Sequence, residues 1–213
     1  MKVSVCIPCY NEEELVVKCL DSVPERDDIE IVITEDCSTD NTYQVLQQYV
    51  KDHPNKIINL LHNEENMGHG YTINKCIDNA TGDWIVELGS DDYFIQDKVL
   101  NFIDTELDYN YDLVFFGLVD NNGRVYLNNK SRLKWSGAVK FIKREWLGDL
   151  RGPADRYGND IGLFRKIVNR QPKMKFTTEV LTHWNFPNKV GTLSWRYLHH
   201  EIDIVGNEIK RGE

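Results

Sequence analysis

Residues 84–94 read WIVELGSDDYF, a short apolar run that leads directly into an acidic turn. The apolar run has the length and composition of a buried strand. Two adjacent carboxylates, Asp91 and Asp92, follow it, and charges this close repel each other unless a cation lies between them. The stretch therefore predicts a buried strand whose carboxyl end opens onto a charged site.

The same succession of an apolar run and a polar loop occurs three times earlier in the chain. β-branched and apolar residues at 3–7, 29–33 and 57–61 predict three more strands, and Pro8 is expected to end the first of them. A further strand is expected at 113–117, after the acidic turn.

Helical patterns separate these runs. Asn11 is placed to cap a first helix, with Glu14 completing a capping box, and Asp40 is placed to cap a second. Apolar residues at helical spacing continue each of the two, and further helices are expected at 69–80 and 95–106.

Short apolar strands that alternate with amphipathic helices predict an α/β fold, with a mostly parallel sheet covered on both faces. In such sheets ligands bind beyond the carboxyl ends of the strands. Four loops occupy these positions, and all carry polar or glycine-rich residues: Cys9–Glu12, Glu35–Thr39, Asn66–Gly70 and Gly89–Tyr93.

The last 95 residues follow another pattern. The turn signal Asn121-Asn122-Gly123 between apolar runs predicts a small antiparallel excursion. Helices are expected near 143–149 and 159–169, and a strand near 179–184.

Composition excludes several classes of protein. The 213 residues carry a net charge of −9, which argues against a surface that binds nucleic acid or anionic membranes. No apolar stretch approaches the roughly 18 residues that span a bilayer, and the N-terminal stretch turns acidic too soon for a signal peptide. Five cysteines are an odd number, so a disulfide framework is not expected and a reducing compartment is. Cys6 and Cys9 have zinc spacing, but no second pair exists.

The polar loops suggest particular ligands. A carboxylate at a strand end, such as Glu35 or Asp36, can accept the N3–H of a uracil or bind a ribose hydroxyl. Gly68, beside a helix start, either lets the backbone approach an anion or forms a plain turn, and Lys75 either reaches a phosphate or extends into solvent. The Asp91–Asp92 turn either caps a helix or binds Mg²⁺ or Mn²⁺, which prefer a few carboxylates, water and ligand phosphates.

Four segments of the chain resemble the inverting glycosyltransferases of family 2, which have the GT-A fold. They occur in the family's order and at its usual spacing: VSVCIPCYN (3–11), IVITEDCSTDNT (31–42), NMGHGYTINKCIDNATG (66–82) and WIVELGSDDY (84–93). Two later segments resemble the family less closely, YGNDI at 157–161 and THWNFPNKVGTLS at 182–194. The resemblance implies a nucleotide-diphosphate-sugar donor, often UDP-linked.

The resemblance also implies roles for individual residues in donor binding. Pro8 and Tyr10 would border the base, and Asp36 or Glu35 would recognise uracil and ribose. Gly68 and Lys75 would lie near the nucleotide. The remaining residues of the implied donor site are Asn11, Glu12, Gly89, Ser90 and Asp92.

Metal binding and catalysis are implied in the same way. Asp91 matches the final Asp of the family's D-x-D metal motif, whereas Gly89 stands at its first Asp. Glu87, two residues earlier on the same face of the strand, is a candidate replacement. Asp160 matches the catalytic base, with Asp155 as the alternative.

Other positions keep two readings. Asn159 stands where the family has a Glu before the base. His183 lies where several GT-A enzymes supply a late metal or phosphate ligand, and an ordinary half-buried histidine is the other reading. Four tryptophans could stack on acceptor sugars or belong to the core: Trp135, Trp146, Trp184 and Trp195.

Together these features predict a cytoplasmic, metal-dependent inverting transferase that moves a sugar from a UDP-sugar to a hydroxyl of a glycan or glycoconjugate, with Mn²⁺ or Mg²⁺ as cofactor. We expect one GT-A domain over 1–213, with a nucleotide-sugar half (1–118) and an acceptor half (119–213), which is one module of a larger protein.

Two alternatives remain. Gly89 and Asn159 favour a nucleotide-sugar-binding domain with weak catalysis. A sugar nucleotidyltransferase is disfavoured, because Cys9–Glu12 is not the Gly-rich, basic loop that such enzymes carry after the first strand.

Overall fold

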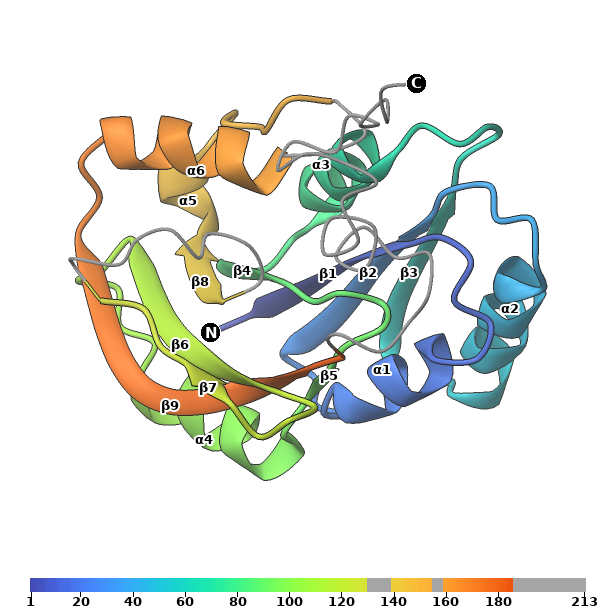
Figure 1. Ribbon diagram of the computed structural model, residues 1–213, viewed down its shortest axis with the longest axis horizontal. Helices are drawn as coiled ribbons and strands as arrows, with labels where there is room; N and C mark the ends of the chain where they lie inside the picture. The colour runs from blue at the N-terminus through green and yellow to red at the C-terminus, as the bar shows by residue number, and fades with distance from the viewer. Residues whose placement is uncertain (130–138, 155–158, 186–213) are drawn as a thin grey trace, which may run out of the picture.

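The computed structural model describes residues 1–129, 139–154 and 159–185, without the side chains of 159–161. Its strands and helices alternate through the first half of the chain (Figure 1). In order, the elements are β1 (Val3–Cys9), α1 (Val16–Ser22), β2 (Ile29–Glu35), α2 (Thr42–Asp52), β3 (Ile57–His62), α3 (His69–Asn79), β4 (Trp84–Glu87), β5 (Tyr93–Phe94), α4 (Gln96–Thr105), β6 (Leu113–Asp120), β7 (Val125–Tyr126), β8 (Lys140–Lys143), α5 (Arg144–Leu147), α6 (Asn159–Asn169) and β9 (Met174–Trp184).

The described strands form one mixed sheet in the order β3-β2-β1-β4-β8-β6-β9-β5, with β7 paired to β6. β1 to β4 are parallel to one another, as the sequence predicts. β8 is antiparallel to both β4 and β6, and β9 returns parallel to β6. β7 pairs antiparallel with β6 across the Asn121-Asn122-Gly123 turn, so the predicted antiparallel excursion is confirmed.

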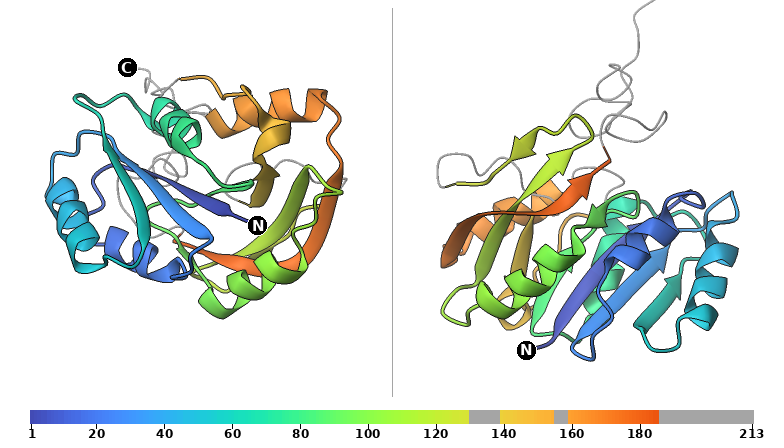
Figure 2. Two further views of the ribbon diagram at one scale, coloured as in Figure 1. Left: turned by 180° about the vertical axis from the view of Figure 1, so that it is seen from behind. Right: turned by 90° about the horizontal axis from the view of Figure 1, so that it is seen from below.

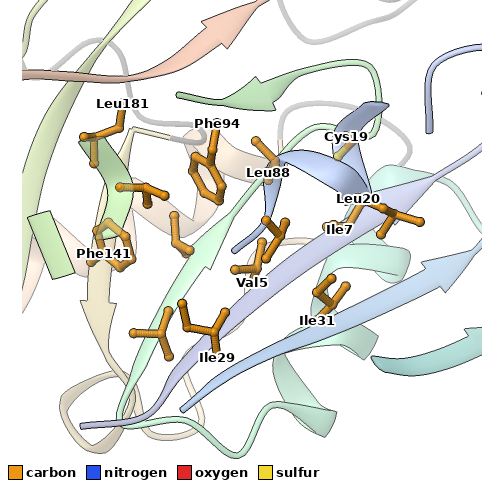
Figure 3. Packing of buried hydrophobic residues seen from close by; sticks show 14 of the residues in the cluster. Val5, Ile7, Cys19, Leu20, Ile29, Ile31, Leu88, Phe94, Phe141 and Leu181 are labelled. Atoms are coloured by element: carbon orange, nitrogen blue, oxygen red, sulfur yellow. The ribbon is translucent and has the colours of Figure 1, made fainter. Parts of the chain in front are cut away.

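Helices cover both faces of the sheet (Figures 1 and 2). Because side chains alternate along a strand, Val5 and Ile7 pack on the face of α1, α2 and α4, whereas Cys6 packs on the face of α3, α5 and α6. Figure 3 shows Val5 and Ile7 in the first core, together with Leu20 of α1 and Phe94 of β5. β1, β2 and most of β4 are thus buried on both faces, which explains their nearly continuous apolar sequence, whereas β3 at the end of the strand order is partly exposed.

The first strand continues through Pro8 to Cys9, so the prediction that Pro8 ends it was wrong. The Cys9 carbonyl accepts the Asp36 N–H on the β2 side, so the backbone of Pro8 faces the β4 side. The last bond on that side joins the Leu88 N–H to the Cys6 carbonyl. Pro8 therefore lies where β4 has already ended, and its missing N–H disrupts no ladder.

The predicted start of the first helix was also wrong. α1 begins at Val16, and Asn11 has a left-handed φ of 55° instead of capping it. The carbonyl of Glu12 accepts the N–H groups of Leu15 and Val16, which makes a turn before the helix. Asn11 hydrogen-bonds the loop after β2 and does not cap α1.

The second helix begins at Thr42. Asn41 occupies the N-cap position without a side-chain capping hydrogen bond, and the Asp40 carboxylate accepts the Thr42 N–H at 2.9 Å. The predicted role of Asp40 at this helix start is thus retained one residue earlier than a standard cap.

The second half differs from the expectation in its boundaries. β9 begins at Met174 rather than near 179. The helix expected near 143–149 is present but shorter, as α5, and the strand β8 directly precedes it. β9 is long and strongly curved (Figure 1), and its pairing with β6 shifts register around Gly117. No helix within the described residues is both long and apolar enough to cross a membrane. All five cysteines are free thiols, as expected.

Candidate active site

The loops after β1 to β4 meet at one edge of the sheet, because these strands are parallel. The first two loops are joined by hydrogen bonds. The N–H of Asn11 donates to Ser38 Oγ at 2.9 Å, and the N–H of Thr39 donates to Asn11 Oδ1 at 2.8 Å. The N–H of Glu12 donates to Thr42 Oγ1 at 2.8 Å. Asn11, through its backbone and its side chain, and Glu12, through its backbone, are therefore held against the loop before α2 and its first residue.

The buried carboxylate of Asp36 organises the third loop. It accepts the N–H groups of Met67 and Gly68, both at 2.8 Å, and the side-chain amide of Asn63 at 2.7 Å. Gly68 has a φ of 84°, which an L side chain rarely adopts, and it immediately precedes α3. Asp36 thus shapes the loop, and its predicted contact with a nucleotide stays a prediction.

Glu35 and Lys75 are engaged in the same way. Glu35 is fully buried, accepts the Ser38 N–H at 2.6 Å and lies 2.7 Å from His62 Nδ1. The ammonium of Lys75 donates to the His62 carbonyl and to Asn63 Oδ1, both at 2.8 Å. Both charged groups therefore support the loops that would surround a nucleotide.

Tyr10 at this edge is exposed, in contrast to the carboxylates of Glu35 and Asp36. Tyr10 is 42% exposed directly after β1 and so remains available to a ligand, as its predicted position beside a base requires.

The acidic turn converges on Gly89. A Cβ atom at this glycine would lie 2.9 Å from Asp92 Oδ2 and 3.0 Å from Asp91 Oδ1. The space in which relatives of the predicted family place a first carboxylate is thus bounded here by the oxygens of the next two. Asp92 is buried, and its Oδ1 accepts the Asn185 N–H at 2.8 Å.

The buried carboxylate of Asp92 lies beside a second negative charge. Burial raises the pKa of Asp92 well above its usual value, and the neighbouring Asp91 raises it further, against the lowering effect of the Asn185 N–H. Two carboxylate oxygens facing one small space provide the few protein ligands that Mg²⁺ or Mn²⁺ needs, with water and diphosphate oxygens completing the shell. The residues therefore fit the metal that the sequence predicts.

Glu87 and His183 do not join this pair. Within the described residues, no group of three or more His, Cys, Asp or Glu side chains is arranged to hold a metal. Glu87 lies 3.3 Å from Nε2 of His69, the first residue of α3. Burial alone would raise the pKa of Glu87, but its hydrogen bond to His69 and the charges of His69 and Lys140 lower it below its usual value. The carboxylate of Glu87 is thus paired with the first residue of α3.

The ring of His183 stacks on Tyr93, with centroids 4.5 Å apart and planes at 9°. Burial lowers the pKa of His183, and the charge of Lys18 lowers it further, while Asp120 raises it. His183 is therefore mainly neutral at neutral pH. Its Nδ1 is buried with no hydrogen-bond partner among the described residues.

The predicted base falls at the border of the described part. Asp160 is in the first turn of α6, but its side chain is not described, and Asp155 lies outside the described residues. α6 packs next to α3. The structure therefore places the backbone of Asp160 and leaves its role a prediction.

Two of the four candidate tryptophans lie within the described residues and two lie outside them. Trp135 and Trp195 lie outside the described residues. Trp146 packs against the core on the α3 face, and Trp184 meets Tyr126 edge to face, with centroids 5.8 Å apart.

Sequence reasoning missed several polar residues of this edge. Asn63 and Asn185 are examples, whereas Ser90, which the sequence does single out, hydrogen-bonds the buried thiol of Cys9. Asn185 carries no local signal, because its partner Asp92 is 93 residues away. His69 could have been found, since it stands between two glycines at the start of a predicted helix.

Comparison with known proteins identifies relatives of this arrangement. Residues 4–196 match the family model described as Glycosyl transferase family 2. A poly(ribitol-phosphate) beta-glucosyltransferase of Bacillus spizizenii is 33% identical over 128 residues, which are 58% of this chain and 20% of that protein. The chain thus spans about a fifth of the length of this curated relative.

Solved structures share the fold. Staphylococcus aureus TarS in complex with UDP-GlcNAc gives a TM-score of 0.71 at 20% identity, over 89% of this chain and 60% of that one. The mannosyltransferase PcManGT from Pyrobaculum calidifontis, in complex with GDP-Man and Mn²⁺, gives 0.73 at 23% identity, over 94% of this chain and 61% of that one.

Proposed function

The chain belongs to glycosyl transferase family 2, and from this premise we propose that it is a metal-dependent, inverting glycosyltransferase. The donor would be a UDP-sugar, and the acceptor a hydroxyl of a glycan or glycoconjugate. The observation that carries the proposal is the convergence of the Asp91 and Asp92 oxygens over Gly89, at the edge where the loops after β1, β2 and β3 also end.

The first three loops would bind the nucleotide. Tyr10 is exposed beside them. Gly68 immediately precedes α3, whose N-terminus favours an anion. The related TarS binds UDP-GlcNAc, which supports a UDP-sugar donor, and Glu35 or Asp36 would recognise the uracil and ribose.

Asp91 and Asp92 would hold the cation, and the Mn²⁺ complex of PcManGT supports such an ion in this fold. A bound cation offsets the negative charge that develops on the departing diphosphate. The two carboxylates would supply the protein ligands, and Asp92 is buried.

Asp160 would take the proton from the acceptor hydroxyl as that hydroxyl attacks the anomeric carbon. Attack on the face opposite the diphosphate gives inversion in one displacement. Asp155 is the alternative base. In this scheme residues 1–118 bind the donor and residues 119–213 face the acceptor, within one GT-A domain over 1–213.

The setting of the reaction is part of the proposal. The five free thiols support a reducing compartment, and hence a cytoplasmic active site.

A turnover assay tests this function. The protein is incubated with Mn²⁺ and a panel of UDP-sugars, and UDP release is measured for the unaltered chain, Asp91→Ala and Asp160→Ala. Both variants should lose at least about 100-fold in rate, because each removes a group that acts in the transition state. Asp52→Ala, at the exposed far end of α2, is the matched control.

Two outcomes would redirect the proposal. UDP binding without turnover of any donor would favour a nucleotide-sugar-binding domain, the alternative that Gly89 motivates. Full activity of Asp160→Ala would move the base to Asp155 or another residue.

A further inference from the structure

Tyr93 directly follows the two carboxylates, and two side chains pack on its ring. The ammonium of Lys18, from α1, lies 3.7 Å from the ring centroid. The imidazole of His183, from β9, is parallel to the ring at 4.5 Å. One aromatic side chain thus links a helix from the beginning of the chain to a strand from its end.

α1 contacts the same segment on both sides of the carboxylates. The Cys19 thiol donates to the Gly89 carbonyl at 3.3 Å, and the Phe94 N–H donates to Ser22 Oγ at 2.9 Å. These bonds bracket Asp91 and Asp92, so α1 fixes both ends of the acidic turn.

β9 contacts the same segment that α1 contacts. Tyr93 pairs with His183 and Phe94 with Thr182 in the antiparallel ladder, and the Asn185 N–H binds Asp92. The acidic turn is therefore clamped between α1 and the end of β9, and the stacked rings are the side-chain part of this clamp.

We propose that His183 and Lys18 are positioning residues, which act through the Tyr93 ring to hold the Asp91–Asp92 turn in its metal-binding geometry, and that His183 is not itself a metal ligand. The inference rests on the proposed function. Its support is the stacked geometry, in which the imidazole of His183 and the ammonium of Lys18 both pack on the Tyr93 ring.

Substitutions at His183 separate the two roles. Phenylalanine retains a flat ring for stacking but cannot bind a metal, whereas alanine removes both properties. Mn²⁺ affinity is measured without donor from the electron paramagnetic resonance signal of free Mn²⁺. His183→Phe should remain within about threefold of the unaltered protein, and His183→Ala should bind Mn²⁺ about tenfold more weakly, since small misplacements of a site cost up to about 100-fold.

Lys18→Met provides an independent variant, because it retains the aliphatic stem and removes the charge over Tyr93. It should weaken Mn²⁺ binding about threefold, while Lys51→Met, on the exposed surface of α2, should leave it unchanged. In turnover assays His183→Ala and Lys18→Met should need more Mn²⁺ for half-maximal rate, with a nearly unchanged kcat at saturating Mn²⁺. Thermal unfolding of each variant verifies that it is folded.

Three results would overturn the inference. Equal losses in His183→Phe and His183→Ala would make the imidazole a ligand. Unchanged Mn²⁺ affinity in His183→Ala and Lys18→Met would deny the stack a positioning role, while leaving the proposed function intact. Failure of the unaltered protein to bind Mn²⁺ even with UDP would overturn the metal-dependent function and the inference together.

Discussion

Glu30 and Asp92 are both buried carboxylates, but they lie at opposite edges of the same sheet and in opposite electrostatic surroundings. Glu30 accepts hydrogen bonds from Ser4 Oγ at 2.5 Å and the Thr81 N–H at 2.6 Å, and it pairs with the Lys2 ammonium at 2.7 Å. Burial alone would raise its pKa, but these partners lower it to about 2.

Asp92 receives one backbone N–H and faces a second carboxylate, and its pKa is raised. The comparison distinguishes two uses of a buried charge. A carboxylate whose partners all belong to the chain joins elements of the fold, as Glu30 joins β1, β2 and the loop before β4. A carboxylate left short of partners marks a place where a ligand can supply them.

The largest effect is expected from Glu30→Ala. The change leaves Ser4, Thr81 and the Lys2 ammonium without their common acceptor, so the free energy of unfolding should fall by about 3–5 kcal/mol. Urea unfolding measures it. Glu30→Gln, which keeps the shape and one acceptor, should lose less. A loss below about 1 kcal/mol for the alanine variant would contradict the structural role of this edge.

The pH dependence of stability should follow from the same residue. The pKa of Glu30 falls from 4.5 to about 2 on folding, a difference worth about 3 kcal/mol. Because the folded pKa is the lower one, this stabilisation is present above pH 4.5 and is lost as the pH falls towards 2. The unfolding free energies of the unaltered protein and of Glu30→Gln should therefore converge over that interval. A constant difference would contradict the assignment.

Mn²⁺ should stabilise the folded chain only at the edge of the sheet that carries Asp91 and Asp92. At about 100 times its dissociation constant it should raise the free energy of unfolding by about 2.7 kcal/mol, because it binds only the folded chain. Thermal unfolding with and without the ion detects this, and a chelator should reverse it. Asp91→Asn should remove most of the effect. An equal stabilisation of that variant would place the ion elsewhere.

The smallest effect is expected from Asp92→Asn in the presence of a chelator. The substitution removes a buried charge beside Asp91 and keeps an oxygen for the Asn185 N–H. Stability should therefore stay unchanged or rise by about 1 kcal/mol, in contrast to Glu30. Urea unfolding at neutral pH is the measurement, and a clear destabilisation would remove the distinction between the two edges.

The sequence was sufficient for the parallel half of the fold, because its strands are short, mainly apolar segments that alternate with amphipathic helices. It was insufficient where a distant partner decides the structure. Asn11 has every property of a helix cap, but Ser38 and Thr39 bind it instead. The start of β9 is hidden because Lys175 and Thr177 are polar, and pairing with β6 makes this segment a strand.

The candidate site shows the same division. The acidic turn and the loops around it are each a short continuous segment at the end of a predicted strand, so their types of residue predict a site. The pairing of Glu87 with His69, and of Tyr93 with Lys18 and His183, depends on how α1, α3 and β9 pack, which no local pattern records.

The Asp36 carboxylate, which binds the loop before α3, also has a kinetic consequence. With this loop fixed by Met67, Gly68 and Asn63 before a donor arrives, capture of the nucleotide need not wait for the loop to order. The association rate should then rise in proportion to donor concentration without a plateau. Discrimination among nucleotides would consequently appear in how long each stays bound rather than in how fast it arrives.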